Sequence, residues 1–172
     1  GHYDHLGIGM PANGDSIYNG AQDNASGTAG VLALAEAFVA SGARPGRSLL
    51  FMAFGAEESG LIGSEAFARR PTMPLSQLAA VMNVDVMNLY GRTRDIGALG
   101  SGHSSLGASF AAAARAEGLR VVEDGNARIE GAFFRSDHFP FAKRGVPAIS
   151  FGSGYDWVDG GVKAGAAAEE AY

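Results

Sequence analysis

The sequence predicts an α/β fold: a three-layer α/β/α sandwich built on a mostly parallel mixed sheet. Short, nearly all-apolar runs alternate with longer stretches whose apolar residues recur at helical spacing, almost throughout the chain. The apolar runs lack the polar alternation of a half-exposed strand, which indicates strands covered on both faces. The 172 residues are 47% hydrophobic and contain no internal repeat or low-complexity linker, so we expect a single domain over residues 1–172.

The first element expected is a loop followed by a helix. Residues 1–24 are rich in Gly, Asn, Asp and His without a clear period, and are expected to form a loop. Residues 25–40 carry apolar side chains on one helical face, after two candidate capping residues, Asn24 and Ser26. Gly42 follows and ends this helix.

The rest of the chain is expected to alternate between buried strands and helices. The expected strands cover residues 47–54, 80–87, 95–99, 119–122 and 147–151. The expected helices cover residues 60–70, 104–117, 137–144 and 162–172. This order is typical of helices packed on a largely parallel sheet.

Composition argues against several kinds of partner. The chain has 13 basic and 18 acidic residues, a net charge of −5, and no basic cluster beyond Arg69-Arg70, so neither nucleic acid nor an anionic membrane surface is expected to bind. No apolar run approaches the ~18 residues of a membrane span. Cysteine is absent, so any metal ion must be held by His, Asp or Glu.

Carboxylates and imidazoles gather near the expected strand ends, where α/β sheets carry their functional groups. Glu57 and Glu58 follow the strand at 47–54, and Asp85 lies near the end of the strand at 80–87. The loop before the first helix adds further candidates: His2, Asp4, His5 and Asp23.

These acidic residues lack nearby cations in the sequence. A buried carboxylate must shift its pKa, pair with a cation or bind a metal, and no Lys or Arg lies within four positions of Glu57-Glu58 or Asp85. Each motif alone has a structural explanation: a polar loop at His2, a helix cap at Asn24, or an acidic first helical turn at Glu57-Glu58. Together they favour a metal site, and oxygen and imidazole ligands without sulfur suit hydrolytic Zn²⁺, with Mn²⁺ or Co²⁺ fitting the same ligands.

Five segments carry a resemblance to a known family: "GHYDHLG", "NGAQDNASGT", "GAEESGLIGS", "NVDVMN" and "RSDHFPFAKRGVPAISF". In this order they resemble the motifs of the M28 zinc aminopeptidases, through essentially the whole chain. The resemblance implies a phosphorylase/hydrolase-like α/β sandwich with a co-catalytic pair of zinc ions. It also implies a peptide substrate with a free N-terminus, whose N-terminal residues are removed. Members of the family are often secreted or periplasmic.

The resemblance also implies a role for each candidate residue. His2 and Asp85 would bind one zinc ion, Glu58 would bind the other, and Asp23 would bridge the two. Glu57 would be the general base, taking a proton from a metal-activated water and passing it to the leaving amine.

Two further motifs flank this ligand set. The carboxylate of Asp4 would orient the ring of His2. Ser136, Asp137 and His138 match a motif beside the site that does not usually contact the metal. These three are consecutive, so they cannot form the relay of a serine hydrolase triad.

One ligand of the family pattern is missing from the chain. The family has a further His beyond the strand expected at 147–151, but no His follows His138. We therefore expect a fragment truncated at both ends, with the missing ligand past Tyr172. His5 or His138 could take that position, although neither occupies the matching motif position.

Two other functions share the predicted fold. A glutaminyl-cyclase-type enzyme would use a single zinc ion, although "GAEESGLIGS" favours a peptidase. A non-catalytic peptidase-like binding domain would keep the fold without the chemistry, although the presence of Glu57 and the expected ligands argues against such a loss.

Overall fold

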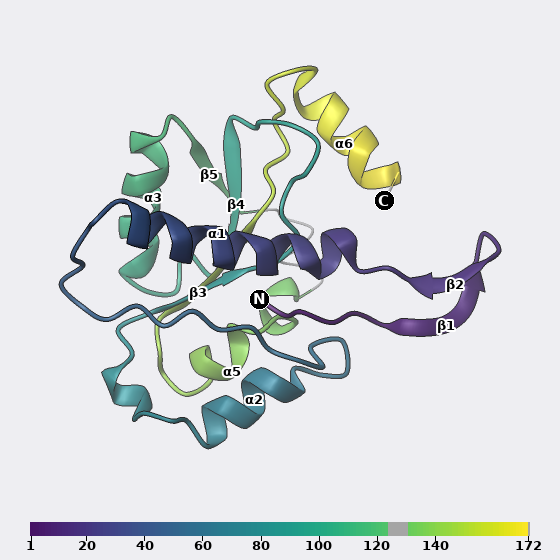
Figure 1. The fold of residues 1–172 in the computed structure, drawn as a ribbon. Coiled ribbons are helices and arrows are strands. Elements are labelled where there is room, and N and C mark those ends of the chain that lie inside the picture. Colours follow the sequence, from purple (N-terminus) through teal and green to yellow (C-terminus); the bar gives the residue numbers. More distant parts are fainter. Residues whose placement is uncertain (124–130, 172) are drawn as a thin grey trace.

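A four-stranded mixed sheet forms the centre of the fold (Figure 1). The structure is a computed structural model that describes residues 1–123 and 131–171. The strands lie in the order β3 (Val81–Val84), β6 (Ala148–Gly152), β4 (Asp95–Leu99) and β5 (Arg120–Val122). β3 and β6 are parallel, as are β4 and β5, while β6 and β4 are antiparallel. The predicted α/β class with a mixed sheet is confirmed.

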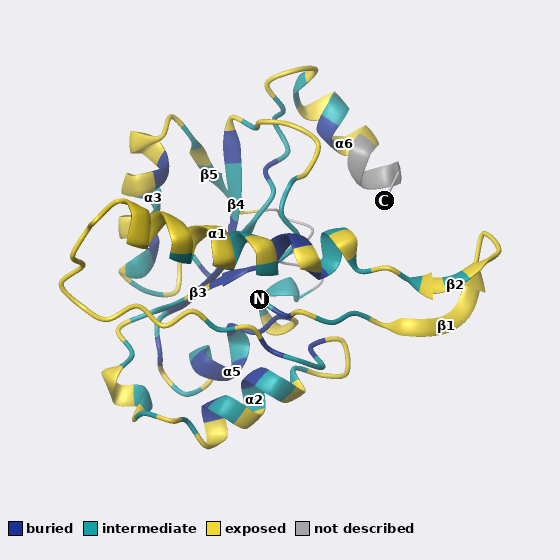
Figure 2. Cartoon of the chain, viewed as in Figure 1, coloured by how far each residue is buried: buried dark blue, intermediate teal, exposed yellow. Residues whose placement is uncertain are grey.

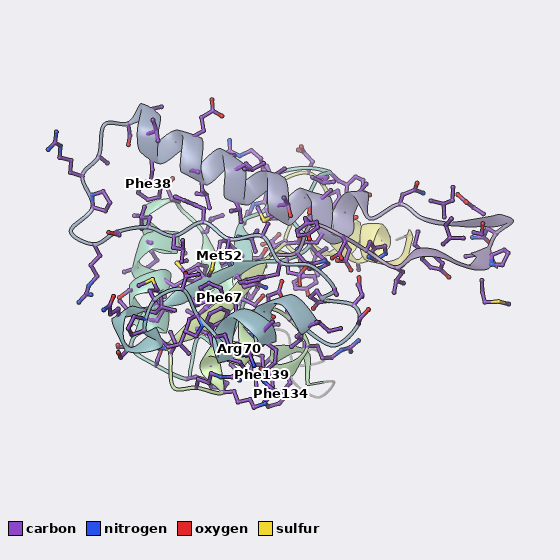
Figure 3. All side chains as sticks on the ribbon, turned by 60° about the horizontal axis from the view of Figure 1, so that its bottom comes forward. Phe38, Met52, Phe67, Arg70, Phe134 and Phe139 are labelled. Atoms are coloured by element: carbon purple, nitrogen blue, oxygen red, sulfur yellow. The ribbon has the colours of Figure 1, made fainter. Side chains whose placement is uncertain are left out.

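Helices pack against this sheet from two sides. α1 (Gly27–Ala40) contacts β3, and α5 (Phe139–Ala142) contacts β6 and α2 (Ile62–Arg69). Figure 3 shows α1 above the strands and α2 and α5 below them. α3 (Leu106–Ala116) packs on β5 and β6, and α6 (Gly161–Ala171) follows at the end of the chain.

The predicted helices and four of the five predicted strands are found, and all of them except the strand at 95–99 have shifted ends. The helix expected at 162–172 corresponds to α6, and Tyr172 lies outside the described residues. Short helical turns were not predicted, and three of them occur in the described chain: Ala21–Ser26, Leu75–Gln77 and Ala132–Phe134. Among the described residues, no helix is long and apolar enough to cross a membrane.

Residues 1–24 contain a β-hairpin, so the prediction of a loop there was wrong. β1 (Gly7–Ala12) and β2 (Asp15–Tyr18) pair antiparallel and project from the body of the molecule (Figure 1). Asn13 and Gly14 both have positive φ, 52° and 87°, as a two-residue hairpin turn requires. The sequence signal for this hairpin is the Asn13-Gly14 turn after apolar residues at alternate positions, Ile8, Met10 and Ala12. The intervening glycine and proline residues weaken that pattern, and both strands are largely exposed.

The strand expected at residues 47–54 does not form. Only Phe54 makes a bridge, to His2, and no described strand lies alongside the preceding residues to complete a hydrogen-bonded ladder. Met52 and Phe54 nevertheless reach the core, while Phe51 is 41% exposed. The segment therefore has one covered side, and the prediction of burial on both faces was also wrong.

The core lies between the sheet, α2 and α5. Phe54, Phe67 and Phe141 form a cluster in which neighbouring ring centroids are 6.0–6.3 Å apart. Ala68 and Val146 complete its buried part. Because Phe54 belongs to this cluster, the core fixes the chain immediately before Glu57 and Glu58.

Most of α1 is exposed. Gly27 is its one fully buried residue, and the apolar face expected on this helix is largely open, with Leu32 66% and Val39 83% exposed (Figure 2). Figure 2 also shows the hairpin as mainly exposed. The well-packed part of the molecule is therefore centred on the sheet, α2 and α5.

Candidate metal centre

Three segments bring His2, Asp23 and Asp85 together. His2 lies on the bridge to Phe54, Asp23 lies in the irregular turn before α1, and Asp85 follows the last residue of β3. His2 Nε2 lies 3.1 Å from Asp23 Oδ1 and 3.4 Å from Asp85 Oδ1. Each residue offers one donor atom within 4.8 Å of the others, so this group could hold a metal ion.

The ring of His2 is oriented by a backbone carbonyl. Its Nδ1 lies 2.8 Å from the carbonyl oxygen of Asp4, and because a carbonyl can only accept, Nδ1 is the donor. Nε2 therefore faces the two carboxylates. The expected contact from the Asp4 carboxylate is absent, since that carboxylate instead accepts the amide N–H of Ala56, at 3.0 and 2.8 Å. Asp4 thus ties His2 to the segment that carries Glu57.

The turn Ala21–Ser26, called here the Asp23 loop, is held against the end of β3 by one buried side-chain amide. Asn24 donates through Nδ2 to the Val84 carbonyl at 3.1 Å, and its Oδ1 accepts the N–H groups of Gly27 at 2.9 Å and Val86 at 3.4 Å. The side chain is 1% exposed. Because Val84 and Val86 flank Asp85, these bonds set the position of Asp23 relative to Asp85.

Ser26 makes a second connection between the same two segments. Its hydroxyl donates to the Gln22 carbonyl at 2.5 Å and accepts the Met87 N–H at 2.9 Å. The predicted capping role therefore holds only for Asn24, whose Oδ1 accepts an N–H at the start of α1; the hydroxyl of Ser26 caps nothing. Sequence reasoning missed the long-range bonds of both side chains because nothing local identifies their partners.

A chain of hydrogen bonds orients Asp85 from the sheet side. Asn83 Nδ2 donates to Ser136 Oγ at 2.7 Å, and Ser136 Oγ donates to Asp85 Oδ2 at 2.5 Å. The other oxygen of Asp85 faces His2. Ser136 thus belongs to the support of the site, in keeping with its expected place beside the metal ligands.

A second group of possible ligands contains Glu58, Asp23 and His5. Their donor atoms lie within 4.8 Å of one another, and His5 Nδ1 is 2.6 Å from Glu58 Oε1. Asp23 belongs to both groups, so its carboxylate could bridge two ions. The sequence analysis named His5 among the candidates of the first loop and as one of two substitutes for the missing His, without a place in the family's ligand set.

Glu57 lies beside both groups and is buried. It offers an oxygen within 4.8 Å of donor atoms on His2 and Glu58, and it is 8% exposed. Burial, together with the negative charge of Asp85, raises the pKa of Glu57 to about 8. A carboxyl group with a pKa near neutrality can exchange a proton under working conditions, as a general base must.

The carboxylates of the centre need a positive charge beside them. Burial lowers the pKa of His2, but the carboxylates of Asp23 and Asp85 and the Asp4 carbonyl outweigh it and raise that pKa to about 11. Burial likewise opposes the charge of Asp85, but His2 and Ser136 hold the pKa of Asp85 below its usual value. Without a metal ion, a proton on His2 supplies the charge that these carboxylates need.

The residues present fit a metal such as zinc. Buried donor atoms without any hydrogen bond among the described residues include His5 Nδ1, Asp23 Oδ1 and Asp85 Oδ1. In the described chain, no Lys or Arg forms an ion pair with Asp23, Glu57, Glu58 or Asp85. Imidazole and carboxylate donors that converge without satisfying one another are the donor set of a hydrolytic zinc site.

A cavity of about 470 Å³ opens onto this centre. The acidic residues and His2 line it together with apolar and aromatic side chains that include Leu99, Phe151, Tyr90 and Trp157. Arg135 and several uncharged polar residues complete the lining. A cavity with both charged and apolar lining can hold a side chain while presenting its backbone to the donors.

His138 and Asp137 lie outside both ligand groups. His138 is fully buried, packs edge-on against Phe133 with ring centroids 4.8 Å apart, and belongs to no group of metal-binding side chains in the described residues. Burial lowers the pKa of His138 to about 4 and raises that of Asp137, so burial favours the neutral form of both. His138 is therefore excluded as the missing ligand.

Imidazole and carboxylate donors that loops beside the sheet of an α/β fold bring to one cavity are typical of metal-dependent hydrolases. The comparisons with known proteins make the assignment specific. The chain belongs to peptidase family M28, whose sequence model matches residues 1–172.

Individual relatives agree with this assignment. The chain is 31% identical to leupeptin-inactivating enzyme 1 of Streptomyces exfoliatus over 154 residues, which are 84% of this chain and 32% of that protein. Among solved structures it is similar to an aminopeptidase from Aneurinibacillus sp. strain AM-1, with 30% identity, a TM-score of 0.59, and coverage of 77% of this chain and 31% of that one.

A zinc aminopeptidase from Bacillus subtilis is also similar. It has 26% identity and a TM-score of 0.62, and the match covers 83% of this chain and 34% of that one. The chain thus spans about a third of the length of the relatives it matches.

Proposed function

We propose that this chain is the metal-binding part of a zinc-dependent exopeptidase that removes N-terminal residues from peptides. The observation that carries the proposal is the buried carboxyl group of Glu57, which lies between His2 and Glu58 and faces the cavity. In the metal-free chain, burial and the charge of Asp85 raise its pKa to about 8, so this carboxyl group can take up a proton near neutral pH. The similarity to aminopeptidases supports the same conclusion.

Each residue then has a defined task. His2 and Asp85 would hold one zinc ion, Glu58 would hold a second, and Asp23 would contribute to both. When bound, the zinc ions supply Lewis acidity that polarises a carbonyl group and lowers the pKa of water. Glu57 accepts the proton of the attacking water and returns it to the leaving amine, so the transfer stays within one buried carboxyl group.

The same acidic wall favours a substrate with a free N-terminus. A protonated α-amino group carries a positive charge, and the centre has a surplus of carboxylates with no Lys or Arg paired to them in the described residues. The apolar side chains that line the cavity can then accept the first side chain. An internal peptide bond lacks this charge, which favours exopeptidase over endopeptidase action.

The existence of two ligand groups favours a peptidase over a glutaminyl cyclase. A single-zinc cyclase needs one set of ligands, whereas here Asp23 joins two separate groups. Release of leucine from leucine p-nitroanilide, compared with cyclisation of a peptide that begins with glutamine, separates the two activities.

Replacement of the proposed base tests the mechanism. Glu57→Gln keeps the shape of the side chain but removes the proton acceptor, so hydrolysis of leucine p-nitroanilide is expected to fall ~100-fold or more, in line with general-base catalysis. Zinc content, measured by mass spectrometry, is expected to stay unchanged. Glu36→Gln on the exposed part of α1 is the matched control and should keep full activity. Loss of zinc in Glu57→Gln would show that Glu57 is a ligand and overturn its role as base.

A further inference from the structure

Two aromatic side chains, Tyr90 and Trp157, lie side by side in the lining of the cavity. Their rings are nearly parallel, with an interplanar angle of 18° and centroids 6.3 Å apart. The hydroxyl of Tyr90 donates to Gln22 Oε1 at 3.3 Å, and Gln22 belongs to the Asp23 loop. The two rings, called here the aromatic wall, are therefore connected to the metal centre.

The main chain passes close to the indole of Trp157 at two glycines. A Cβ on Gly91 would lie 3.9 Å from Trp157 Cε3, and a Cβ on Gly165, in α6, would lie 3.3 Å from Trp157 Cδ1. Neither position has a side chain that could hold the ring. The direction of the indole therefore depends on how the main chain of Trp157 itself is held.

A guanidinium group holds this part of the main chain. Arg94 Nη1 donates to the Trp157 carbonyl oxygen at 2.7 Å, and Arg94 Nη2 donates to the Val158 carbonyl oxygen at 2.9 Å. Nη1 also donates to Asp156 Oδ1 at 3.2 Å. The planar fork of a guanidinium fixes the geometry of several acceptors at once, which a single ammonium group does not. Arg94 thus fixes the peptide groups from which the indole projects.

The importance of Arg94 lies in this geometry rather than in its charge. Its side chain is 50% exposed, and its ionic partner Asp156 also pairs with Arg120, at 2.7 Å. Ion pairs open to solvent contribute little to stability. Loss of Arg94 should therefore affect the position of Trp157 more than the stability of the fold.

Other bonds keep the same segment beside β4 without Arg94's side chain (Figure 1). Oδ1 of the buried Asp95 accepts the N–H groups of Tyr155 and Asp156, each at 2.9 Å. The main-chain N–H of Arg94 donates to the Asp156 carbonyl at 2.8 Å. Removal of the guanidinium is thus expected to loosen the chain at Trp157 while the residues before it stay in place.

We propose that Arg94 is a positioning residue that holds Trp157 in the aromatic wall, where the indole contacts the side chain of the first residue of the substrate. The inference rests on the proposed function, because it concerns the substrate of the same cavity. Two aromatic rings favour a large apolar or aromatic first side chain, since it buries more surface against them than a methyl group does.

The indole of Trp157 can report this contact directly. It is the single tryptophan of the chain, so its ring N–H gives one signal in a proton–nitrogen correlation spectrum. The probes are L-phenylalaninol and L-alaninol, which carry a free amine and cannot be hydrolysed. In the zinc-loaded wild type, phenylalaninol is expected to shift the indole signal and to bind at least ~10-fold more tightly than alaninol. Phenylalaninol that binds without moving this signal would overturn the contact.

Arg94→Met tests the positioning role in the same titration. Its dissociation constant for phenylalaninol is expected to rise ~10-fold, while that for alaninol, whose methyl group makes little contact with the wall, changes less than about 2-fold. The indole signal of the free variant should broaden, because the ring is no longer held in one place. Arg92→Met is the matched control: Arg92 is exposed and its side chain forms no hydrogen bond or ion pair in the described residues, so it should behave as the wild type.

Arg94→Lys provides a second variant that keeps the positive charge. It loses the fork, so it should show the same selective loss of phenylalaninol binding to a smaller extent. Wild-type affinity for phenylalaninol in both variants would overturn the positioning role. Equal weakening of phenylalaninol and alaninol would overturn it as well, since it would indicate a general disturbance of the cavity.

The wild-type titration also separates this inference from the proposed function. If both probes bind equally well and the indole signal does not move, the inference fails, while a centre that binds a free amine remains. If neither probe binds to the zinc-loaded chain, both the inference and the proposed function fail.

Discussion

The side chain of Asn24 sets the geometry of the metal centre, although it is not among the possible ligands. Its amide joins the Asp23 loop to the backbone on both sides of Asp85. Gly27 makes this possible, because its N–H reaches Asn24 Oδ1 at 2.9 Å and it has no side chain to push the amide away. The resulting distance between the two carboxylates is therefore controlled by a buried amide and a glycine.

Gly27→Ala is expected to disturb this arrangement. A Cβ at this position would overlap both Asn24 Oδ1 and the Val84 carbonyl oxygen, so one of them must move. We expect a loss of stability of about 1–3 kcal/mol, as for overpacking, and zinc affinity reduced roughly 10–100-fold, as for loss of a supporting contact. Urea unfolding and zinc titration measure the two effects.

Gly30→Ala is the control on the same helix. A Cβ there meets Val84 Cγ1 at 3.7 Å and Met87 Cγ at 3.9 Å, which are ordinary contacts. Alanine is the better helix former by ~1 kcal/mol, so this variant should be equally or more stable. Equal zinc affinity and stability in Gly27→Ala and Gly30→Ala would contradict the role given to Gly27.

At the residue scale, the sequence identified most of the centre but only part of its supports. His2, Asp23, Glu58 and Asp85 were named from their motifs, and the structure brings each of them into a ligand group. The closeness of His5 to Glu58 could not be predicted, because it depends on the path of the hairpin between them and Asp23. The same holds for hydrogen bonds between residues far apart in sequence, such as those of Asn24 and Ser136.

At the scale of elements, an ion pair joins α2 to the chain after α5. Arg144 meets Glu65 through two nearly parallel bonds, Nη2 to Oε1 at 2.7 Å and Nη1 to Oε2 at 2.9 Å, and Nη1 also donates to the Pro140 carbonyl. Arg69, one turn along α2, adds a further bond to Glu65. This network thus ties α2 to the end of the segment that contains α5.

Arg144→Met should weaken this junction in a pH-dependent way. Hydrogen bonding to Arg144 and Arg69 lowers the pKa of Glu65 to about 2 from an ordinary 4.5. The stabilisation from this group is therefore complete above pH ~4.5 and is lost as the pH falls toward 2, where Glu65 is protonated in the folded state as well. The variant should be less stable at pH 7, and its difference from the wild type should shrink with falling pH.

Chemical unfolding followed from pH 7 to pH 2.5 measures this difference. Arg70→Met is the matched control, since Arg70 is exposed and forms no ion pair in the described residues. A difference between Arg144→Met and the wild type that stays constant over this range would assign the effect to packing of the side chain rather than to the charge pair.

Strands were predicted correctly where an apolar run has a partner strand beside it in the native sheet. The strand expected at 95–99 was found with the same ends, because β4 lies between two partners in the sheet. The run at 47–54 has an equally apolar pattern, but without an adjacent strand in the described chain it stays extended and half exposed. Apolar composition indicates that a segment can be buried, whereas pairing depends on which neighbours are present.

At the scale of the whole molecule, the centre concentrates negative charge. The chain has a net charge of −5, and four carboxylates from distant segments converge on one cavity: Asp23, Glu57, Glu58 and Asp85. Folding must bring these charges together, which opposes the compact state unless cations balance them. A bound metal ion would therefore link the hairpin side of the molecule to the end of β3.

Removal of metal should destabilise the entire chain. Zinc at 100 times its dissociation constant adds ~2.7 kcal/mol of stability for one site, so a chelator is expected to lower the melting temperature by several degrees. Differential scanning calorimetry with and without zinc measures the change. His2→Asn, which removes a ligand of the first group, should show a smaller response, and an unchanged melting temperature in the wild type would argue against a metal centre.

The hairpin of β1 and β2 also bears on the order in which the molecule assembles. Hairpins close in ~1–10 μs through contacts between residues near in sequence, whereas β3 and β6 must meet across a long stretch of chain. His5 and Asp23 stand at the two ends of the hairpin and can become neighbours during this early, local step. Glu58 joins them only as the core forms, so two of the three residues of the second ligand group are brought together by fast chain closure and the third by the slow folding of the core.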